Sequence, residues 1–221
     1  RQPRGALEQE IVGEAVAHRR GDYILATKVG MKVGEAPEDE NTSPEAIRIQ
    51  LRRSLTRMRT DYVDVYYLHR YDPDTEPHAV ARAMGEELRA GTIRAWGVSN
   101  YTAAQLAALL AAAADEGVPA PALCQPALSM LNTGALEELL PLCEKEGVGV
   151  VPYQLLQGGM LTGKYRRGQE APAGSRLAEK PEWMKPFTDE TYDVIERCAA
   201  EAAAEGVTMT QHALRWALAQ P

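Results

Sequence analysis

The chain has 221 residues, of which 45% are hydrophobic and 25% are charged, and its formal net charge is −7. This length and apolar content allow one sizeable core, whereas the acidic balance gives no support to binding of nucleic acid or an anionic membrane. No apolar run approaches the roughly 20 residues that span a bilayer, and the first residues show no secretory signal. Three widely spaced cysteines without a Cys-x-x-Cys pair and four scattered histidines predict reduced thiols, a cytoplasmic location and no metal site.

Five short apolar runs rich in β-branched and aromatic residues predict strands. They cover residues 23–27, 63–68, 93–98, 122–124 and 148–153. Successive runs start 26 to 40 residues apart, which leaves room for a helix and two loops between parallel strands.

The stretches between these runs carry helix signals. Ser43, Pro44 and Glu45 provide an N-cap, a proline at the first helical position and an acid in the first turn of a helix that reaches Leu55. Further helices are expected over residues 76–88, 102–116 and 136–146, each followed by a glycine. This alternation of strands and helices predicts a parallel α/β fold.

Residues 158–188 interrupt this alternation, since they are rich in glycine and proline and show little periodicity. A disordered insertion is one interpretation, and a loop that covers a binding site is the other. Tyr165, Trp183 and Phe187 favour a segment that packs on the rest of the protein.

Each predicted strand ends in a polar or aromatic residue. Because parallel strands place their carboxyl ends at one rim, these residues predict a small-molecule site there. Lys28 could act as a Schiff-base nucleophile or as a cation that lowers a neighbouring pKa, and His69 as a general acid or a neutral donor. No Gly-x-Gly-x-x-Gly motif follows a strand, which disfavours a Rossmann dinucleotide site. The rim residues are Lys28, His69, Ser99 with Asn100, Gln125, and Tyr153 with Gln154.

An ordered set of motifs resembles the aldo-keto reductase family from about residue 6 to the end of the chain. The motifs are Ala-Thr-Lys-Val-Gly (26–30), Ser-Leu-Thr-Arg-Met (54–58), Asp-Tyr-Val-Asp (61–64), Tyr-Leu-His-Arg (67–70), Gly-Val-Ser-Asn-Tyr (97–101), Gln-Pro (125–126), Gly-Gly-Met-Leu-Thr-Gly-Lys-Tyr (158–165), Gly-Ser-Arg (174–176) and Ala-Leu-Arg-Trp (213–216). The resemblance implies a (β/α)8 TIM barrel, incomplete here with about five strands. Residues 1–221 would form one partial barrel domain, with 158–188 as a loop that covers the cofactor.

The resemblance also implies NADPH-dependent reduction of an aldehyde or ketone by a tetrad of Asp, Tyr, Lys and His. Lys28 matches the lysine that lowers the pKa of the proton-donating tyrosine, and His69 matches the histidine that orients the carbonyl. The positions that hold the nicotinamide carboxamide match Ser99, Asn100 and Gln125, and the aromatic residue stacked on the nicotinamide ring matches Tyr153. Phosphate contacts are implied for Gln154, Leu155, Leu156, Gln157, Gly158, Lys164 and Arg176.

The sequence departs from the family pattern in several respects, and two of them bear on the proposed chemistry. Tyr153 is followed by Gln154 and Leu155 where the family usually has Ser-Pro, so the fixed proline turn at the pyrophosphate is lost. The family's aspartate and tyrosine precede the helix that begins here near Leu7, so both are expected upstream of Arg1, and the last strand and helix beyond Pro221. Five strands cannot close an eight-stranded barrel, so we expect these residues alone to be inactive and prone to aggregate.

Two other functions stay open. One is an NADPH-binding regulatory subunit similar to the potassium-channel β subunits, which tend to carry asparagine at the position of His69. The histidine therefore favours the enzyme. The other is a Schiff-base aldolase that uses Lys28, which borohydride trapping would reveal. For the reductase and for the aldolase alike, the expected partner is a small carbonyl compound.

Overall fold

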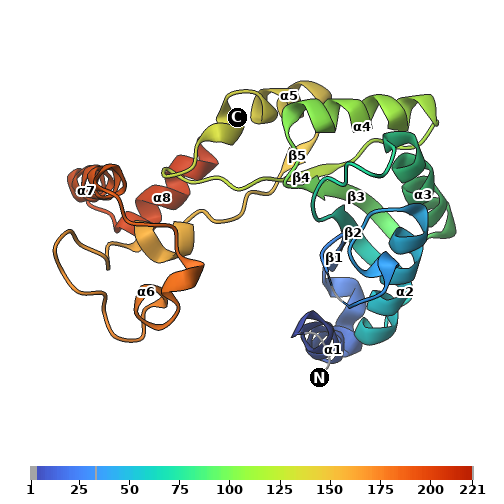
Figure 1. The fold of residues 1–221 in the computed structure, drawn as a ribbon, viewed down its shortest axis with the longest axis horizontal. Helices are drawn as coiled ribbons and strands as arrows, with labels where there is room; N and C mark the ends of the chain where they lie inside the picture. The colour runs from blue at the N-terminus through green and yellow to red at the C-terminus, as the bar shows by residue number, and fades with distance from the viewer. Residues whose placement is uncertain (1–3, 33, 221) are drawn as a thin grey trace. The chain divides into compact units, whose positions relative to one another are not determined.

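The computed structural model describes residues 4–32 and 34–220, which form two compact units (Figure 1). The first unit comprises the residues up to Gln125 together with Leu142–Val151. The second comprises Pro126–Pro141 and the residues from Pro152 onward. In the described ranges, no helix has both the length and the apolar content needed to cross a bilayer. The expectation of one domain over residues 1–221 stays a prediction.

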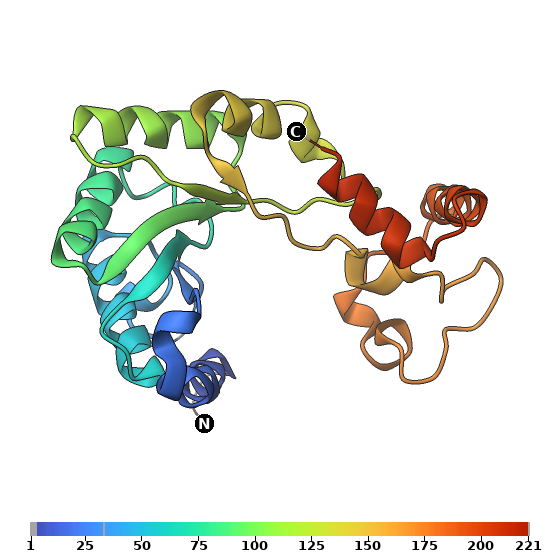
Figure 2. The same cartoon turned by 180° about the vertical axis from the view of Figure 1, so that it is seen from behind.

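The first unit is built on one sheet of five parallel strands, which are ordered in space as they are in the chain. Figures 1 and 2 show helices α2, α3 and α4 along one face of this sheet. These features confirm the predicted parallel α/β fold. Within residues 4–32 and 34–220 the sheet is open, with β1 and β5 at its edges. The strands are β1 (Ala26–Val29), β2 (Val63–Leu68), β3 (Ile93–Ser99), β4 (Leu123–Gln125) and β5 (Gly149–Val150), and the helices are α1 (Arg4–Val16), α2 (Pro44–Met58), α3 (Pro77–Ala90) and α4 (Ala103–Asp115), with α5 (Leu139–Glu146) before β5.

Local sequence signals start and stop these helices. The hydroxyl of Ser43 accepts a hydrogen bond from the backbone N–H of Ala46 at 3.2 Å, which caps α2. Thr102 and Gln105 form a reciprocal capping box at the start of α4. Gly91 ends α3 at a φ of 72°, in the left-handed region that glycine adopts without steric cost.

Strand β2 is buried on both faces, as expected for the interior of a parallel sheet. Tyr66 lies on the helix side, where its hydroxyl donates to the carbonyl of Ile47 in α2 at 3.0 Å. Since side chains alternate along a strand, Tyr67 lies on the opposite face. The helices thus cover one face of the sheet and leave the other face to the predicted rim residues.

The strand bounds differ from the sequence prediction at both edges. The first strand begins at Ala26. The carbonyl of Leu25 still accepts from β2, but its N–H donates to the carboxylate of Asp64 at 2.8 Å, and Ile24 before it is 82% exposed. The fifth strand is limited to Gly149–Val150. Helix α5 starts later than predicted because residues 134–136 form a separate 3-10 turn.

The second unit has its own apolar core. Helix α7 (Asp189–Ala204) and helix α8 (Met209–Leu218) contribute most of it, and each begins at a threonine whose hydroxyl accepts a backbone hydrogen bond. Met160 and Leu161 of the 3-10 helix η4 (Gln157–Thr162) complete the core. The buried members are Met160, Leu161, Ile195, Cys198, Ala202, Met209 and Ala213.

The segment over residues 158–188 contains short helices, namely most of η4, α6 (Arg176–Glu179) and η5 (Pro181–Trp183). Tyr165 is buried and packs edge-on against Phe187, with 5.2 Å between the ring centroids. Trp183 is 56% exposed. Two of the three aromatic residues therefore pack, as the sequence predicts. The role of residues 158–188 as a loop that covers the cofactor stays a prediction.

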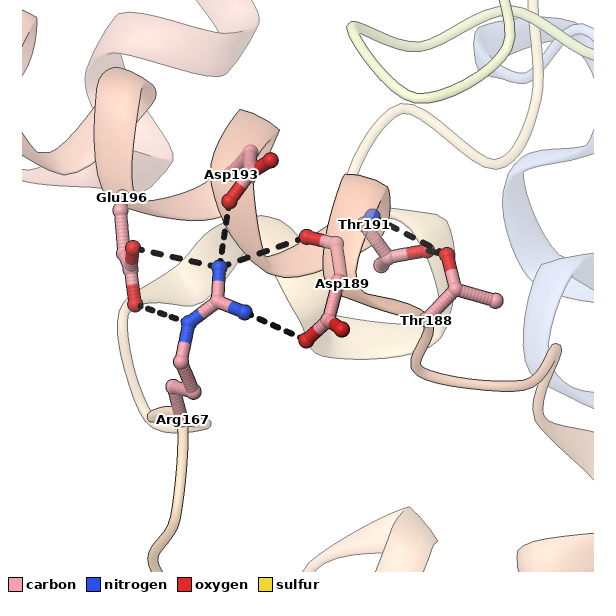
Figure 3. Close-up of polar contacts among 6 residues, drawn as sticks. All are labelled: Arg167, Thr188, Asp189, Thr191, Asp193 and Glu196. Atoms are coloured by element: carbon pink, nitrogen blue, oxygen red, sulfur yellow. Dashed lines mark hydrogen bonds and ion pairs between the residues drawn. The ribbon is translucent and has the colours of Figure 1, made fainter.

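Arg167 ties this segment to α7 (Figure 3). Its guanidinium lies 2.6 Å from a carboxylate oxygen of Asp189, 2.5 Å from one of Asp193 and 3.1 Å from one of Glu196. Its Nη2 also donates to the main-chain carbonyl of Asp189 at 3.3 Å. A single arginine thus bridges the loop and the first two turns of the helix.

Candidate functional site

The ends of the first four strands bring five predicted residues to one edge of the first unit. Parallel strands in register place their carboxyl ends together. His69 directly follows β2, and its N–H donates to the carbonyl of Val29, the last residue of β1, at 2.8 Å. The ends of β1 and β2 therefore lie side by side at His69. The predicted residues at this edge are Lys28 in β1, His69 after β2, Ser99 and Asn100 at the end of β3, and Gln125 at the end of β4.

Hydrogen bonds connect the ends of β2, β3 and β4. The amide nitrogen of Asn100 donates to the carbonyl of His69 at 2.8 Å and to the hydroxyl of Ser99 at 3.1 Å. The hydroxyl of Ser99 donates in turn to the carbonyl of Gln125 at 2.8 Å. Asn100 has a φ of 58°, a left-handed conformation that asparagine tolerates better than most residues. The network fixes the backbone on which these polar side chains stand.

The positive charge of Lys28 affects the titration of His69. Both residues line one cavity of about 610 Å³ beside the edge strand β1, and most of the other residues that line it come from α1 and α2. Burial lowers the pKa of Lys28. Burial also lowers the pKa of His69, and the positive charges of Lys28 and Arg70 lower it further. Near neutral pH the imidazole is therefore uncharged, with one nitrogen able to donate and the other able to accept.

In the second unit, four predicted residues line a cavity of about 360 Å³. They are Tyr153, Gln154, Gln157 and Gly158. Tyr153 is 37% exposed at this cavity, and its side chain carries an aromatic ring. Asn132, Trp183, Met184 and Lys185 also line this cavity.

The two predicted phosphate-binding cations lie beside the Gly158–Gly159 pair. Both glycines have positive φ, 67° and 101°. A Cβ on Gly159 would lie 3.1 Å from Nζ of Lys164, and a Cβ on Gly158 would lie 3.8 Å from a guanidinium nitrogen of Arg176. The backbone here can therefore approach an anion closely, with a cation on either side.

The residues between Tyr153 and Gly158 are partly committed to the fold. Leu156 packs against the core of the second unit, and its carbonyl accepts from the N–H of Gly159 at 2.8 Å. Gln157 is buried and accepts a hydrogen bond from the hydroxyl of Ser129 at 3.1 Å. Leu155 is half-buried. Any contact of Leu155, Leu156 and Gln157 with a ligand would come mainly from their backbone, whereas Gln154 is exposed and lines the cavity.

Sequence reasoning missed several residues at these places. Tyr67 lies beneath the ammonium of Lys28, and its position two residues before His69 on one strand face could have revealed it. Asn132 and Lys185 lie in irregular segments without periodicity, and no signal in the sequence indicated them. The sequence indicates Trp183 only as an aromatic residue that packs, and not as part of a cavity.

The chain is similar in sequence to a known protein family and to several known proteins. A sequence model described as "Aldo/keto reductase family" matches residues 5–221. The chain is 33% identical over 220 residues to the "Probable voltage-gated potassium channel subunit beta" of Oryza sativa subsp. japonica, which covers 96% of this chain and 66% of that protein. It is 28% identical over 225 residues to the L-glyceraldehyde 3-phosphate reductase of Escherichia coli (strain K12), which covers 98% of this chain and 64% of that protein.

A solved structure supports the same relationship. The chain matches the glycerol dehydrogenase AKR11B4 from Gluconobacter oxydans with a TM-score of 0.78 and 29% identity, over 96% of this chain and 65% of that one. This match confirms the predicted TIM-barrel class, in which these residues provide five parallel strands. The chain spans just under two thirds of the length of these relatives. With a family match over residues 5–221, the chain belongs to the aldo/keto reductase family.

Proposed function

We propose that the protein reduces an aldehyde or ketone to the alcohol, with NADPH as the hydride donor. The observation that carries the proposal is an ammonium in β1 and an imidazole directly after the neighbouring parallel strand β2, Lys28 and His69, which line one cavity, with the charge of Lys28 lowering the pKa of His69. Because the chain spans just under two thirds of its relatives' length, this activity is proposed for the whole protein.

The two side chains have complementary tasks in this reaction. The neutral imidazole of His69 donates a hydrogen bond to the carbonyl oxygen and so orients it. The ammonium of Lys28 provides positive potential where negative charge develops on that oxygen, and its lowered pKa reflects a partly desolvated site in which this potential is stronger.

The donor set also fits a nicotinamide dinucleotide. The side-chain amides of Asn100 and Gln125 match the donors and acceptors of a carboxamide, and the hydroxyl of Ser99, which donates to the carbonyl of Gln125, would serve as an acceptor. The aromatic ring of Tyr153, a residue that lines the cavity of the second unit, suits stacking on a planar ring.

A phosphate-binding role is proposed for the loop that follows Tyr153. Lys164 and Arg176 beside the Gly158–Gly159 pair suit a pyrophosphate, and the backbone of Gln154, Leu155, Leu156 and Gln157 would complete the contacts. When bound, NADPH supplies the hydride, while these residues hold and orient it.

An NADPH-binding subunit without turnover is the second candidate. The identity of 33% to a protein named as a potassium channel subunit beta favours it. His69 favours the reductase, because the imidazole is the group that would act on a carbonyl.

The test follows nucleotide binding and turnover separately. The protein is titrated with NADPH, and with NADH in parallel, while nucleotide fluorescence is recorded. The loss of NADPH absorbance is then followed with a panel of small aldehydes and ketones. We expect Lys28→Met and His69→Asn to bind NADPH like the parent and to lose roughly 100-fold or more in kcat.

Two exposed residues provide matched controls. Lys32 forms an ion pair with Glu35, and His78 in α3 pairs with Asp115. Lys32→Met and His78→Asn should retain parental turnover. Binding of NADPH without turnover by the parent would support the second candidate instead. Absence of nucleotide binding would overturn both.

A further inference from the structure

One row of residues crosses the whole sheet of the first unit. The strand register pairs Lys28 with Tyr67, Tyr67 with Gly97, Gly97 with Leu123, and Leu123 with Gly149. Residues paired in this way across parallel strands lie on the same face of the sheet. From Tyr67 onward, the row therefore alternates a large side chain with a glycine.

The glycines provide space for the neighbouring side chains. A Cβ on Gly97 would lie 2.8 Å from Cε1 of Tyr67 and 2.5 Å from the carbonyl oxygen of Leu123. A Cβ on Gly149 would lie 2.9 Å from Cδ2 of Leu123. Both distances on Gly97 are shorter than van der Waals contact, so the ring of Tyr67 can occupy its position only because residue 97 has no side chain.

The ring of Tyr67 is the contact that the described residues offer to the ammonium of Lys28. Nζ of Lys28 lies 5.4 Å from the ring centroid, within the roughly 6 Å over which a cation is attracted to an aromatic face. Tyr67 is 3% exposed, and burial raises the pKa of its hydroxyl, so the ring stays neutral.

We propose that Tyr67, seated on Gly97, is a positioning residue that holds the ammonium of Lys28 on the sheet face that carries His69. The ring attracts the ammonium and carries no charge of its own, so this contact fixes the position of Lys28 without forming an ion pair. The catalytic meaning of this role rests on the function proposed above. The physical contact between the ring and the ammonium does not.

The pKa of Lys28 is the direct measure of this contact. It can be obtained by NMR titration of isotope-labelled lysine side chains, with the signal of Lys28 assigned by its loss in Lys28→Met. We expect Tyr67→Leu to lower the pKa of Lys28, because the apolar surroundings remain while the attraction of the ring to the charged form is lost. We expect Tyr67→Phe to leave that pKa unchanged, because the ring face is retained.

A second tyrosine provides the matched control. Tyr62 lies just before the other end of β2, beneath the guanidinium groups of Arg20 and Arg94 at 4.1 and 4.5 Å. Tyr62→Leu should leave the pKa of Lys28 at its parental value. Should Tyr67→Leu fail to fold, Tyr67→Met offers a flexible apolar side chain in the same comparison.

An unchanged or raised pKa of Lys28 in Tyr67→Leu would overturn the proposal, as would an equal shift in Tyr67→Phe. The titration needs no nucleotide and no turnover. A lowered pKa in a protein that binds no NADPH would thus sink the proposed function alone. Nucleotide-dependent turnover with an unmoved pKa of Lys28 would sink the role of Tyr67 alone.

Discussion

The side-chain amide of Asn100 donates a hydrogen bond to the main-chain carbonyl of His69 at 2.8 Å. This bond joins the residue after β3 to the residue after β2, so it links a proposed nucleotide ligand to the proposed carbonyl-orienting group. The same nitrogen lies 3.1 Å from the hydroxyl of Ser99. The position of His69 therefore depends on a residue outside its own strand.

Asn100→Asp should destabilise the protein and weaken its binding of NADPH. Aspartate keeps the shape and tolerates the left-handed backbone, but it presents only acceptor oxygens to the carbonyl of His69. For an exposed hydrogen bond we expect a loss of about 0.5–1 kcal/mol in unfolding free energy, measured in urea. Asn100→Gly, which removes the side chain and suits the backbone, should lose less. An aspartate variant as stable as the parent at neutral pH would contradict this.

Lys28→Met should raise the pKa of His69. Burial is the main cause that lowers this pKa from its ordinary 6.5, and the charge of Lys28 is the next. Because the folded-state pKa is the lower one, the unfolded chain binds more protons, and the protein loses stability as pH falls through 6.5 toward the folded-state value. In Lys28→Met this acid loss should be smaller. NMR titration of the imidazole and urea unfolding across that range check both points.

Lys32→Met is the control for this experiment, since Lys32 is exposed and paired with Glu35. It should leave the pKa of His69 unchanged. If Lys28→Met and Lys32→Met shift that pKa equally, the coupling between Lys28 and His69 is a general effect of net charge and not of their proximity.

The local sequence predicted the strand ends and helix starts because short-range physics determines them. A serine before proline and glutamate can cap only the helix that follows, as Ser43 does. A histidine directly after a buried β-branched and aromatic run must emerge at the end of that strand, as His69 does. Parallel topology then brings Lys28 and His69 to one edge without further information.

The features that the sequence did not predict depend on contacts between distant residues. The N–H of Leu25 donates to the side chain of Asp64, 39 residues later. The side chain of Gln157 is turned inward by Ser129, 28 residues earlier. The position of the Tyr67 ring requires an empty place at Gly97 on the next strand, and no periodicity within β2 indicates it.

Gly97→Ala should strongly destabilise the first unit, although it adds only one methyl group. The added Cβ would meet the carbonyl oxygen of Leu123 at 2.5 Å, and backbone cannot move aside as a flexible side chain can. Overpacking of this kind typically costs about 1–3 kcal/mol. Gly21→Ala is the control in the same unit, because nothing lies within 4 Å of its Cβ position. Equal urea midpoints for the two variants would show that the sheet accommodates a methyl group at Gly97.

Arg167→Gln should loosen the loop that precedes α6. Arg167 bonds three carboxylates of α7 through one guanidinium, and the hydrogen bond with Glu196 is the main cause that raises its pKa. Glutamine cannot bridge three acids, and the carboxylates of Asp189, Asp193 and Glu196 are then left close together without a shared cation. Hydrogen exchange of the amides of residues 164–175 should become faster in the variant, while that of the buried part of α7 changes less.

Arg166→Gln separates the bridge from a change in net charge. Arg166 is the adjacent exposed arginine, and it carries the same charge without forming the ion pairs of Arg167 with α7 in the described structure. Its replacement should leave exchange over residues 164–175 unchanged. Added salt should bring the parent toward Arg167→Gln, because exposed ion pairs are screened over about 10 Å at 0.1 M ionic strength. If exchange is equally fast in both variants, or if salt leaves the parent unaffected, then packing of Tyr165 on Phe187, and not Arg167, holds this loop in place.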